Sequence, residues 1–233
     1  GLLVACAGAG ETGKLREFKN VIVMVPDGCA NPLPAIARAN GTTSSGRSPY
    51  RPKPVSTLMW VMAQVAVAVA AAESARAAAD ALTSELLSRL QAEMKEGGPA
   101  SAVLVCSVVA PEIARERSAG GATVRRVSLK ARNPADAPDA WERERLLALE
   151  AGRAAGEALP KEIVETVEAN GRTELRYLRP IVVGPPCLAC HGERAAMDAE
   201  VRKILDDRYP GDPAIGYRAG DLRGAVSVRV PIE

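Results

Sequence analysis

Residues 162–192 read EIVETVEANGRTELRYLRPIVVGPPCLACHG, and this stretch decides what kind of domain the chain forms. Its first part holds two β-like runs, residues 162–168 and 173–183. The runs meet at Asn170-Gly171, a dipeptide that favours the tight turn of a β-hairpin because both residues tolerate positive φ. We therefore expect an antiparallel pair of strands that leads directly into the segment after residue 183.

That segment ends in Cys187-Leu188-Ala189-Cys190-His191 and is introduced by Gly184-Pro185-Pro186. Two cysteines three positions apart can each add a thiol across a vinyl group of haem, and a histidine that follows directly is then held beneath the iron. The motif predicts one covalently attached c-type haem. Cys187 and Cys190 would form the thioethers, and His191 would bind the iron.

The cysteine and histidine counts limit the alternatives. The chain has a single histidine, which excludes bis-histidine haem ligation and any Ser-His or Cys-His catalytic pair not built on His191. An odd number of cysteines argues against a disulfide framework. A thioredoxin-like CxxC is expected at a helix start after an early strand, whereas this motif follows a hairpin near the C-terminus. A zinc site needs four ligands, to which Cys106 alone could add a thiolate. The cysteines are Cys6, Cys29, Cys106, Cys187 and Cys190.

The second axial ligand of the iron cannot be a histidine, so Met, Cys, Lys, water or an open position remain. Met197 follows His191 too closely to reach the opposite haem face, and Met94 is explained by core packing at the end of a predicted helix. Cys106 lies on the apolar face of another predicted helix. From the residues alone, a plain buried cysteine and an iron ligand explain Cys106 equally well.

The pattern around the hairpin predicts the other elements. Leu82, Leu86 and Leu90 recur four apart and predict a helix over residues 73–96, which Gly97-Gly98-Pro99 ends. A second helix is expected over residues 100–118, with Cys106 facing inward and a kink at Pro111. The remaining predicted elements are a strand at 123–130, helices at 141–157 and 198–207, and a strand at 224–231. Two helices followed by strands with a helix between them predict an α+β domain with an antiparallel sheet.

The segment before this domain is typical of an export signal. Basic residues precede an apolar run, Leu58–Ala70, and small residues at Ala68–Ala72 form an A-x-A-like cleavage region. The run is short and alanine-rich for a membrane span; a buried or peripheral helix and a retained membrane anchor are the alternatives. The predicted organisation is an atypical segment over 1–50, a signal-peptide-like or anchor segment over 51–72, and a haem domain over 73–233. Because haem c is attached outside the cytoplasm, we expect a periplasmic or otherwise extracytoplasmic protein.

The composition of the chain limits the classes of partner molecule and the residue types of the core. The 30 basic and 28 acidic residues leave a net charge of +2, which gives no electrostatic case for a nucleic-acid partner. Aromatic residues make up 3% of the chain, so the core should consist of Ala, Leu, Val and Ile.

Several stretches of the chain match the sequence motifs of one known protein family. They are Val105-Cys106 with Ala110-Pro111, Ser128–Lys130 with Arg132–Pro134, Pro138–Glu142, Tyr177-Leu178 with Pro180-Ile181, Cys187–Gly192, and the tail from Tyr209-Pro210 to Gly224-Ala225. Through these stretches, residues 73–233 resemble a Tll0287-like domain, a family of haem c proteins with a PAS-like fold.

The resemblance implies a PAS-like domain whose antiparallel sheet is flanked by helices, with a helical pair at its N-terminus. It implies His191 as the proximal ligand and a cysteine as the opposite ligand, which falls on Cys106. A thiolate opposite histidine would stabilise ferric iron and lower the reduction potential. Candidates to line the haem pocket or bind its propionates are Lys130, Arg132, Asn133 and Trp141.

The N-terminal segment carries a different resemblance. Residues 19–28, KNVIVMVPDG, are similar to the opening strand of an alkaline phosphatase, and Leu3–Cys6 is similar to a lipoprotein lipobox. No nucleophile region and no histidine cluster follow. We expect this fragment to be non-functional and predict no phosphatase activity.

The function expected from these observations is that of a periplasmic redox or small-ligand sensor module that binds haem through His and Cys. A single-haem electron-transfer cytochrome is the alternative. No acid or base is placed by the sequence to support an enzyme. The expected partners are a separate redox or signalling protein and a diatomic gas, with membrane contact only through an uncleaved N-terminal segment.

Overall fold

The computed structural model describes residues 55–169 and 171–232 of the chain. The phosphatase-like fragment and the lipobox therefore lie outside the described residues. The chain divides into two units, residues 1–67 and 68–233. In the first unit, the described residues belong to the start of helix α1 (Val55–Glu96) and expose the large side chains of Met59, Trp60 and Met62. The second unit holds the sheet and the site.

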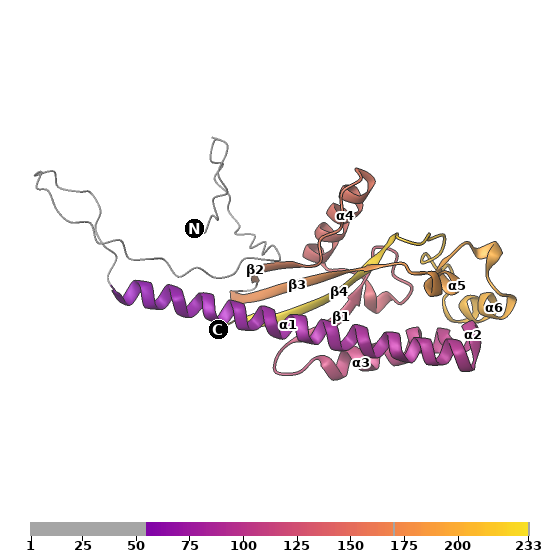
Figure 1. Cartoon of the computed structure of the whole chain (residues 1–233), viewed down its shortest axis with the longest axis horizontal. Coiled ribbons are helices and arrows are strands. Elements are labelled where there is room, and N and C mark those ends of the chain that lie inside the picture. The colour runs from indigo at the N-terminus through magenta and orange to yellow at the C-terminus, as the bar shows by residue number, and fades with distance from the viewer. Residues whose placement is uncertain (1–54, 170, 233) are drawn as a thin grey trace, which may run out of the picture. The chain divides into compact units, whose positions relative to one another are not determined.

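The centre of the second unit is a four-stranded sheet in the order β1-β4-β3-β2, in which every neighbouring pair is antiparallel (Figure 1). Its strands are β1 (Thr123–Val127), β2 (Ile163–Ala169), β3 (Arg172–Val182) and β4 (Leu222–Ile232). The predicted hairpin is confirmed: β2 pairs with β3, and Gly171 has the positive φ of 73° that the turn needs.

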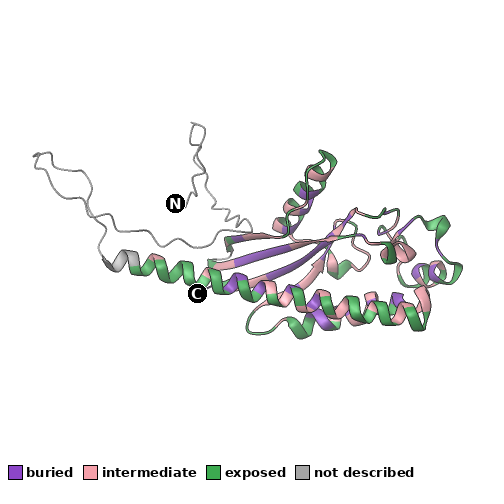
Figure 2. Ribbon diagram, in the orientation of Figure 1, coloured by how far each residue is buried: buried purple, intermediate pink, exposed green. Residues whose placement is uncertain are grey.

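Alternate residues of the central strands face opposite layers of helix. On one face, Tyr177 and Val228 pack with a buried stripe of α1 that includes Ala75, Ala79 and Leu82. On the other face, the apolar side of α4 packs on the sheet. Members of this second cluster are Leu146, Leu149, Val127, Leu178, Leu222 and Ala225. Figure 2 shows the buried strands between the two helical layers. The expected α+β fold with helices flanking an antiparallel sheet is thus confirmed.

Helix α4 (Ala140–Ala154) begins at a capping box. Asp139 accepts a hydrogen bond from the Glu142 backbone N–H, and the Glu142 carboxylate accepts one from the Asp139 backbone N–H. The same carboxylate side chain is buried, and it also accepts from the Ser227 hydroxyl at 2.7 Å. These contacts fix the start of α4 against β4.

The predicted second helix is present, but a wider turn takes the place of the expected kink. It consists of α2 (Gly98–Leu104), the π-helical turn η1 (Val105–Val109) and α3 (Ala110–Arg117). Gly98 has φ 73°, which ends α1 and redirects the chain as predicted. Cys106 lies in η1.

The haem-motif segment lies beyond one end of the sheet, beside α2. It consists of the turn η3 (Pro185–Cys187) and the short helix α5 (Leu188–His191), and is followed by η4 (Arg194–Ala196) and α6 (Ala199–Arg208). Met197 is buried there with Val103 and Leu205. The predicted strand at 123–130 ends early at Val127, because the Ser128 N–H turns away to donate to the Asp136 carbonyl of η2 (Pro134–Asp136) at 3.0 Å.

Two described helical stretches, Met59–Glu96 and Gly98–Arg117, are long and apolar enough to cross a membrane. The second packs in the domain through Val103, Ile113 and Ala114.

Candidate functional site

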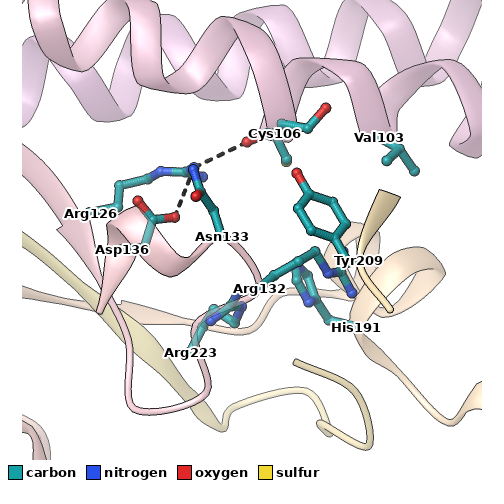
Figure 3. A pocket seen from close by; sticks show the side chains of 10 residues that line it. Val103, Cys106, Arg126, Arg132, Asn133, Asp136, His191, Tyr209 and Arg223 are labelled. Carbon is teal, nitrogen blue, oxygen red and sulfur yellow. Dashed lines mark hydrogen bonds and ion pairs between the residues drawn. The ribbon is translucent and has the colours of Figure 1, made fainter. Parts of the chain in front are cut away.

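A small cavity of about 40 Å³, partly open to solvent, lies between the η1 helical segment and the haem-motif segment. Cys106 lies on the helical wall and His191 on another wall (Figure 3). The structure therefore brings together the two residues that were expected to bind iron, although they are far apart in the sequence. The full lining is Val103, Cys106, Ser107, Arg126, Arg132, Asn133, Asp136, His191, Tyr209 and Arg223.

His191 is held in the form that binds a metal. Its Nδ1 lies 2.7 Å from the Ala214 carbonyl oxygen, so Nδ1 carries a proton that it donates, and Nε2 keeps its lone pair. Burial, together with the positive charges of Arg223 and Arg132, lowers the pKa of His191 to about 2. The imidazole is therefore neutral at physiological pH.

A buried ion pair braces the haem-motif segment. The Arg132 guanidinium lies 2.8 Å from the Asp212 carboxylate and also donates to the Cys190 carbonyl at 2.6 Å. The other oxygen of Asp212 accepts from the Ala214 N–H at 2.8 Å, and it is the Ala214 carbonyl that orients His191. Arg132 and Asp212 thus hold both the motif and the partner that fixes the histidine.

The two motif cysteines precede His191 in the chain and do not line the cavity themselves. Cys187 packs with Val183 and Tyr217, and Cys190 packs with the α6 cluster. Burial raises the pKa of Cys190 to about 11, so this side chain is a neutral thiol. All three cysteines of the described residues are free of disulfides.

The cavity carries an excess of positive charge, with three arginines and one aspartate on its walls. Arg126 pairs with Asp136 at 3.5 Å, and Arg132 pairs with Asp212. Arg223 donates to the Ser128 hydroxyl and the Lys130 carbonyl, and no carboxylate of the described residues forms an ion pair with it. Burial and the positive charges of Arg132 and Arg126 lower the pKa of Arg223 below its ordinary value, although Tyr217 and Asp136 act in the opposite direction.

Two of the four residues suggested for the pocket do line it, namely Arg132 and Asn133. Lys130 instead lies over the Tyr217 ring, 5.0 Å from its centroid. The expectation for Trp141 is wrong: its indole N–H donates to Glu165, on the face of the sheet that α4 covers. Trp141 belongs to the α4 layer because it is the second residue of that helix, inside the capping box that Asp139 and Glu142 form.

Arg126 and Arg223 were missed as pocket residues. Arg126 lies in β1 and Arg223 in β4, and these strands pair with each other. The period-two pattern tells which face of the sheet a strand residue takes, but an arginine near the end of a strand also depends on the loops that fold beyond it. The adjacent Arg125-Arg126, between Val124 and Val127 of a predicted strand, was the available signal for Arg126.

The donors around the cavity suit a haem better than a bare metal ion. No group of three or more His, Cys, Asp or Glu side chains in the described part of the chain comes together to hold an ion, whereas a haem iron needs one ligand on each face. Arg223, which no described carboxylate pairs with, suits a propionate, and the CxxC pair directly precedes His191. The residues present therefore fit the group.

Comparisons with known proteins identify the family to which the chain belongs. A family model described as Tll0287-like matches residues 61–231. The chain is similar to the solved "Crystal structure of the cyanobacterial heme-protein Tll0287", with 33% identity over 55% of this chain and 71% of that chain and a TM-score of 0.45. A search of curated proteins found no match. Because the family model covers most of the sequence, including the helices, the sheet and the cavity residues, the chain belongs to the Tll0287-like family.

Proposed function

We propose that the protein binds one haem c, held by thioethers to Cys187 and Cys190 and by the axial ligands His191 and Cys106. The observation that carries this proposal is that Cys106 and His191 line one cavity beside the CxxC motif. Membership of a family with a solved haem protein supports haem binding independently.

Each residue of the site has a distinct part in this proposal. His191 offers Nε2 to the iron while the Ala214 carbonyl fixes its ring. Cys106 offers a thiolate from the opposite wall, and the unpaired Arg223 receives a propionate. Bound haem would supply one-electron redox chemistry and a place for a diatomic ligand.

We propose further that the protein works outside the cytoplasm as a redox or small-ligand sensor module, and not as an enzyme. The two axial ligands come from separate segments, and Cys106 lies on a helix that haem attachment does not fix. Exchange of Cys106 for a small molecule would therefore alter a helix on the surface of the domain. A separate redox or signalling protein would read that change.

A single-haem electron carrier is the second candidate. The opening of the cavity to solvent favours it, because an exposed cofactor edge permits direct electron transfer to a partner. The two functions differ in what occupies the sixth coordination position of the iron in the reduced protein. A sensor would release Cys106 and bind carbon monoxide rapidly, whereas an electron carrier would keep its ligand and exclude the gas. Stopped-flow mixing of reduced protein with carbon monoxide distinguishes them.

Haem attachment and ligation need a separate experiment. Protein produced with a haem c attachment system should keep haem after denaturing electrophoresis and give a c-type pyridine haemochrome. Cys106→Ala should change the ferric absorption spectrum, whereas Ser107→Ala, which alters a neighbouring residue of the same cavity, should leave it unchanged. Loss of all haem on denaturation would refute covalent attachment, and an unchanged Cys106→Ala spectrum would refute Cys106 as ligand.

A further inference from the structure

We propose that Pro111 and Arg126 together position Cys106: the proline leaves the Cys106 carbonyl without a helical partner, and the arginine captures that carbonyl and so fixes the backbone that carries the thiolate. This inference rests on the proposed function, in which Cys106 binds iron. It assigns to Arg126 a positioning role and not contact with the iron.

The first step is the hydrogen-bond pattern of the π-helical turn. In η1 (Val105–Val109) the Ala110 N–H donates to the Val105 carbonyl, five residues back. The next bond of that kind would join the Cys106 carbonyl to residue 111. Pro111 has no N–H, so this bond cannot form. The carbonyl of the proposed ligand residue is thereby released from the helix. Single π-turns of this type are frequent at functional sites.

The second step is the partner that replaces the missing bond. The Arg126 guanidinium donates to the Cys106 carbonyl oxygen at 3.1 Å (Figure 3). A partly buried carbonyl without a partner would be costly, and a charged donor forms a stronger bond than a neutral one. The hydrogen bond from Arg126, a residue of the sheet, therefore replaces the bond that the helix backbone cannot supply to the Cys106 carbonyl.

The third step is how Arg126 is itself held. Its guanidinium pairs with Asp136 at 3.5 Å, and both side chains are mostly buried, with exposed fractions of 19% and 24%. The backbone of Asp136 is anchored on both sides, since its N–H donates to the Asn133 carbonyl and its carbonyl accepts from Ser128. The sheet, the η2 turn and the helix are thus joined at one point, directly behind Cys106.

The consequence for the ligand follows from covalent geometry. The carbonyl and the side chain of Cys106 share one Cα, so a fixed carbonyl limits the backbone rotations that would swing the thiol away. Without the arginine, the π-turn is free to shift its register, and the thiolate loses its fixed position. Pro111 and Arg126 together thus determine where the Cys106 thiolate lies and how readily it dissociates from the iron.

The test uses the haem-loaded protein and three variants. Arg126→Gln should lower the ratio of thiolate-ligated to unligated ferric haem about tenfold, as expected for loss of one charge-assisted hydrogen bond, measured by absorption and electron paramagnetic resonance. Arg126→Lys, which keeps a charged donor, should restore part of the ratio. Arg125→Gln is the matched control: Arg125 pairs with Glu142 and does not line the cavity, so stability falls without a spectral change.

A double-mutant cycle with Pro111→Ala makes the test independent of simple unfolding. Alanine supplies an N–H to the Cys106 carbonyl, so Arg126→Gln should change the spectrum less in that background than in the original chain. Equal effects in both backgrounds, or no spectral effect of Arg126→Gln while Cys106→Ala has one, would overturn the positioning role. If Cys106→Ala itself changes nothing, the ligand assignment is wrong and the positioning role is lost with it.

Discussion

At the scale of single residues, Arg132 is the side chain on which the haem-motif segment depends most. It is 9% exposed, and its partner Asp212 is 3% exposed. Arg132→Leu would leave the Asp212 carboxylate buried without its cation and free the Cys190 carbonyl. We expect it to lower the free energy of unfolding by about 3 kcal/mol, measured by urea unfolding.

The control for Arg132 is Lys203→Gln, which removes the exposed ion pair with Asp207 on α6. Because both of these side chains are well solvated, no measurable change is expected. A similar decrease in the free energy of unfolding in the two variants would show that burial does not determine how much the Arg132–Asp212 ion pair stabilises the domain.

Asp139 should make stability depend on pH. Burial alone would raise the pKa of Asp139, but the hydrogen bond from the Glu142 N–H and the Arg176 guanidinium outweigh it, so the pKa lies below its ordinary value of 3.8. An acid whose pKa is lower in the folded state adds stability above the unfolded pKa and loses it as pH falls through the folded pKa.

Asp139→Asn tests this linkage, since asparagine caps the helix as well but carries no charge. The variant should be less stable than the original chain at pH 7, and the difference should close as pH falls below 3.8. Urea midpoints across that range measure it; a difference that stays constant with pH would contradict the linkage.

At the scale of elements, the contact between α1 and the sheet depends on small side chains. Ala75 is fully buried in the core, whereas Ala77, two residues on, is exposed. Ala75→Leu should destabilise the domain by about 1–3 kcal/mol because the added carbons have no space. Ala77→Leu adds the same atoms on the solvent side and should have little effect. Thermal unfolding of both variants gives the comparison, and equal shifts would mean that the alanine stripe does not set the packing distance.

At the scale of the whole molecule, the boundary between the export-like segment and the domain has a testable consequence. Ala71 and Ala72 are buried in the core cluster with Val226 and Val228, although they lie in the predicted cleavage region. We expect them to remain in the mature protein, with the apolar run before them acting as an anchor. Intact mass and membrane fractionation of the exported protein test this; a soluble product that begins at Glu73 would contradict it.

Much of the molecule could be predicted from local sequence. Asn170-Gly171 predicted the hairpin, because turn geometry is set by adjacent residues. The helical spacing around Cys106 predicted that its side chain faces inward, and Cys106 does line the cavity. The residues that complete the cavity were harder to predict: Arg126 and Arg223 meet there through the register of β1 with β4, which no local pattern encodes. The start of α1 at Val55 was also missed, because an export signal and a core helix share the same apolar composition.

The separation of the two proposed iron ligands has one more consequence. Cys106 precedes β1, β2 and β3, and His191 follows them, so bonds from both residues to a single iron would close a loop around three of the four strands. A closed loop lowers the entropy of the unfolded chain and thereby raises resistance to denaturation and proteolysis. Loss of the thiolate bond would open that loop. If the thiolate bond breaks on reduction, the reduced protein would have a more flexible chain than the oxidised protein. A bound partner or a protease would distinguish the two oxidation states by this flexibility, without contact to the haem.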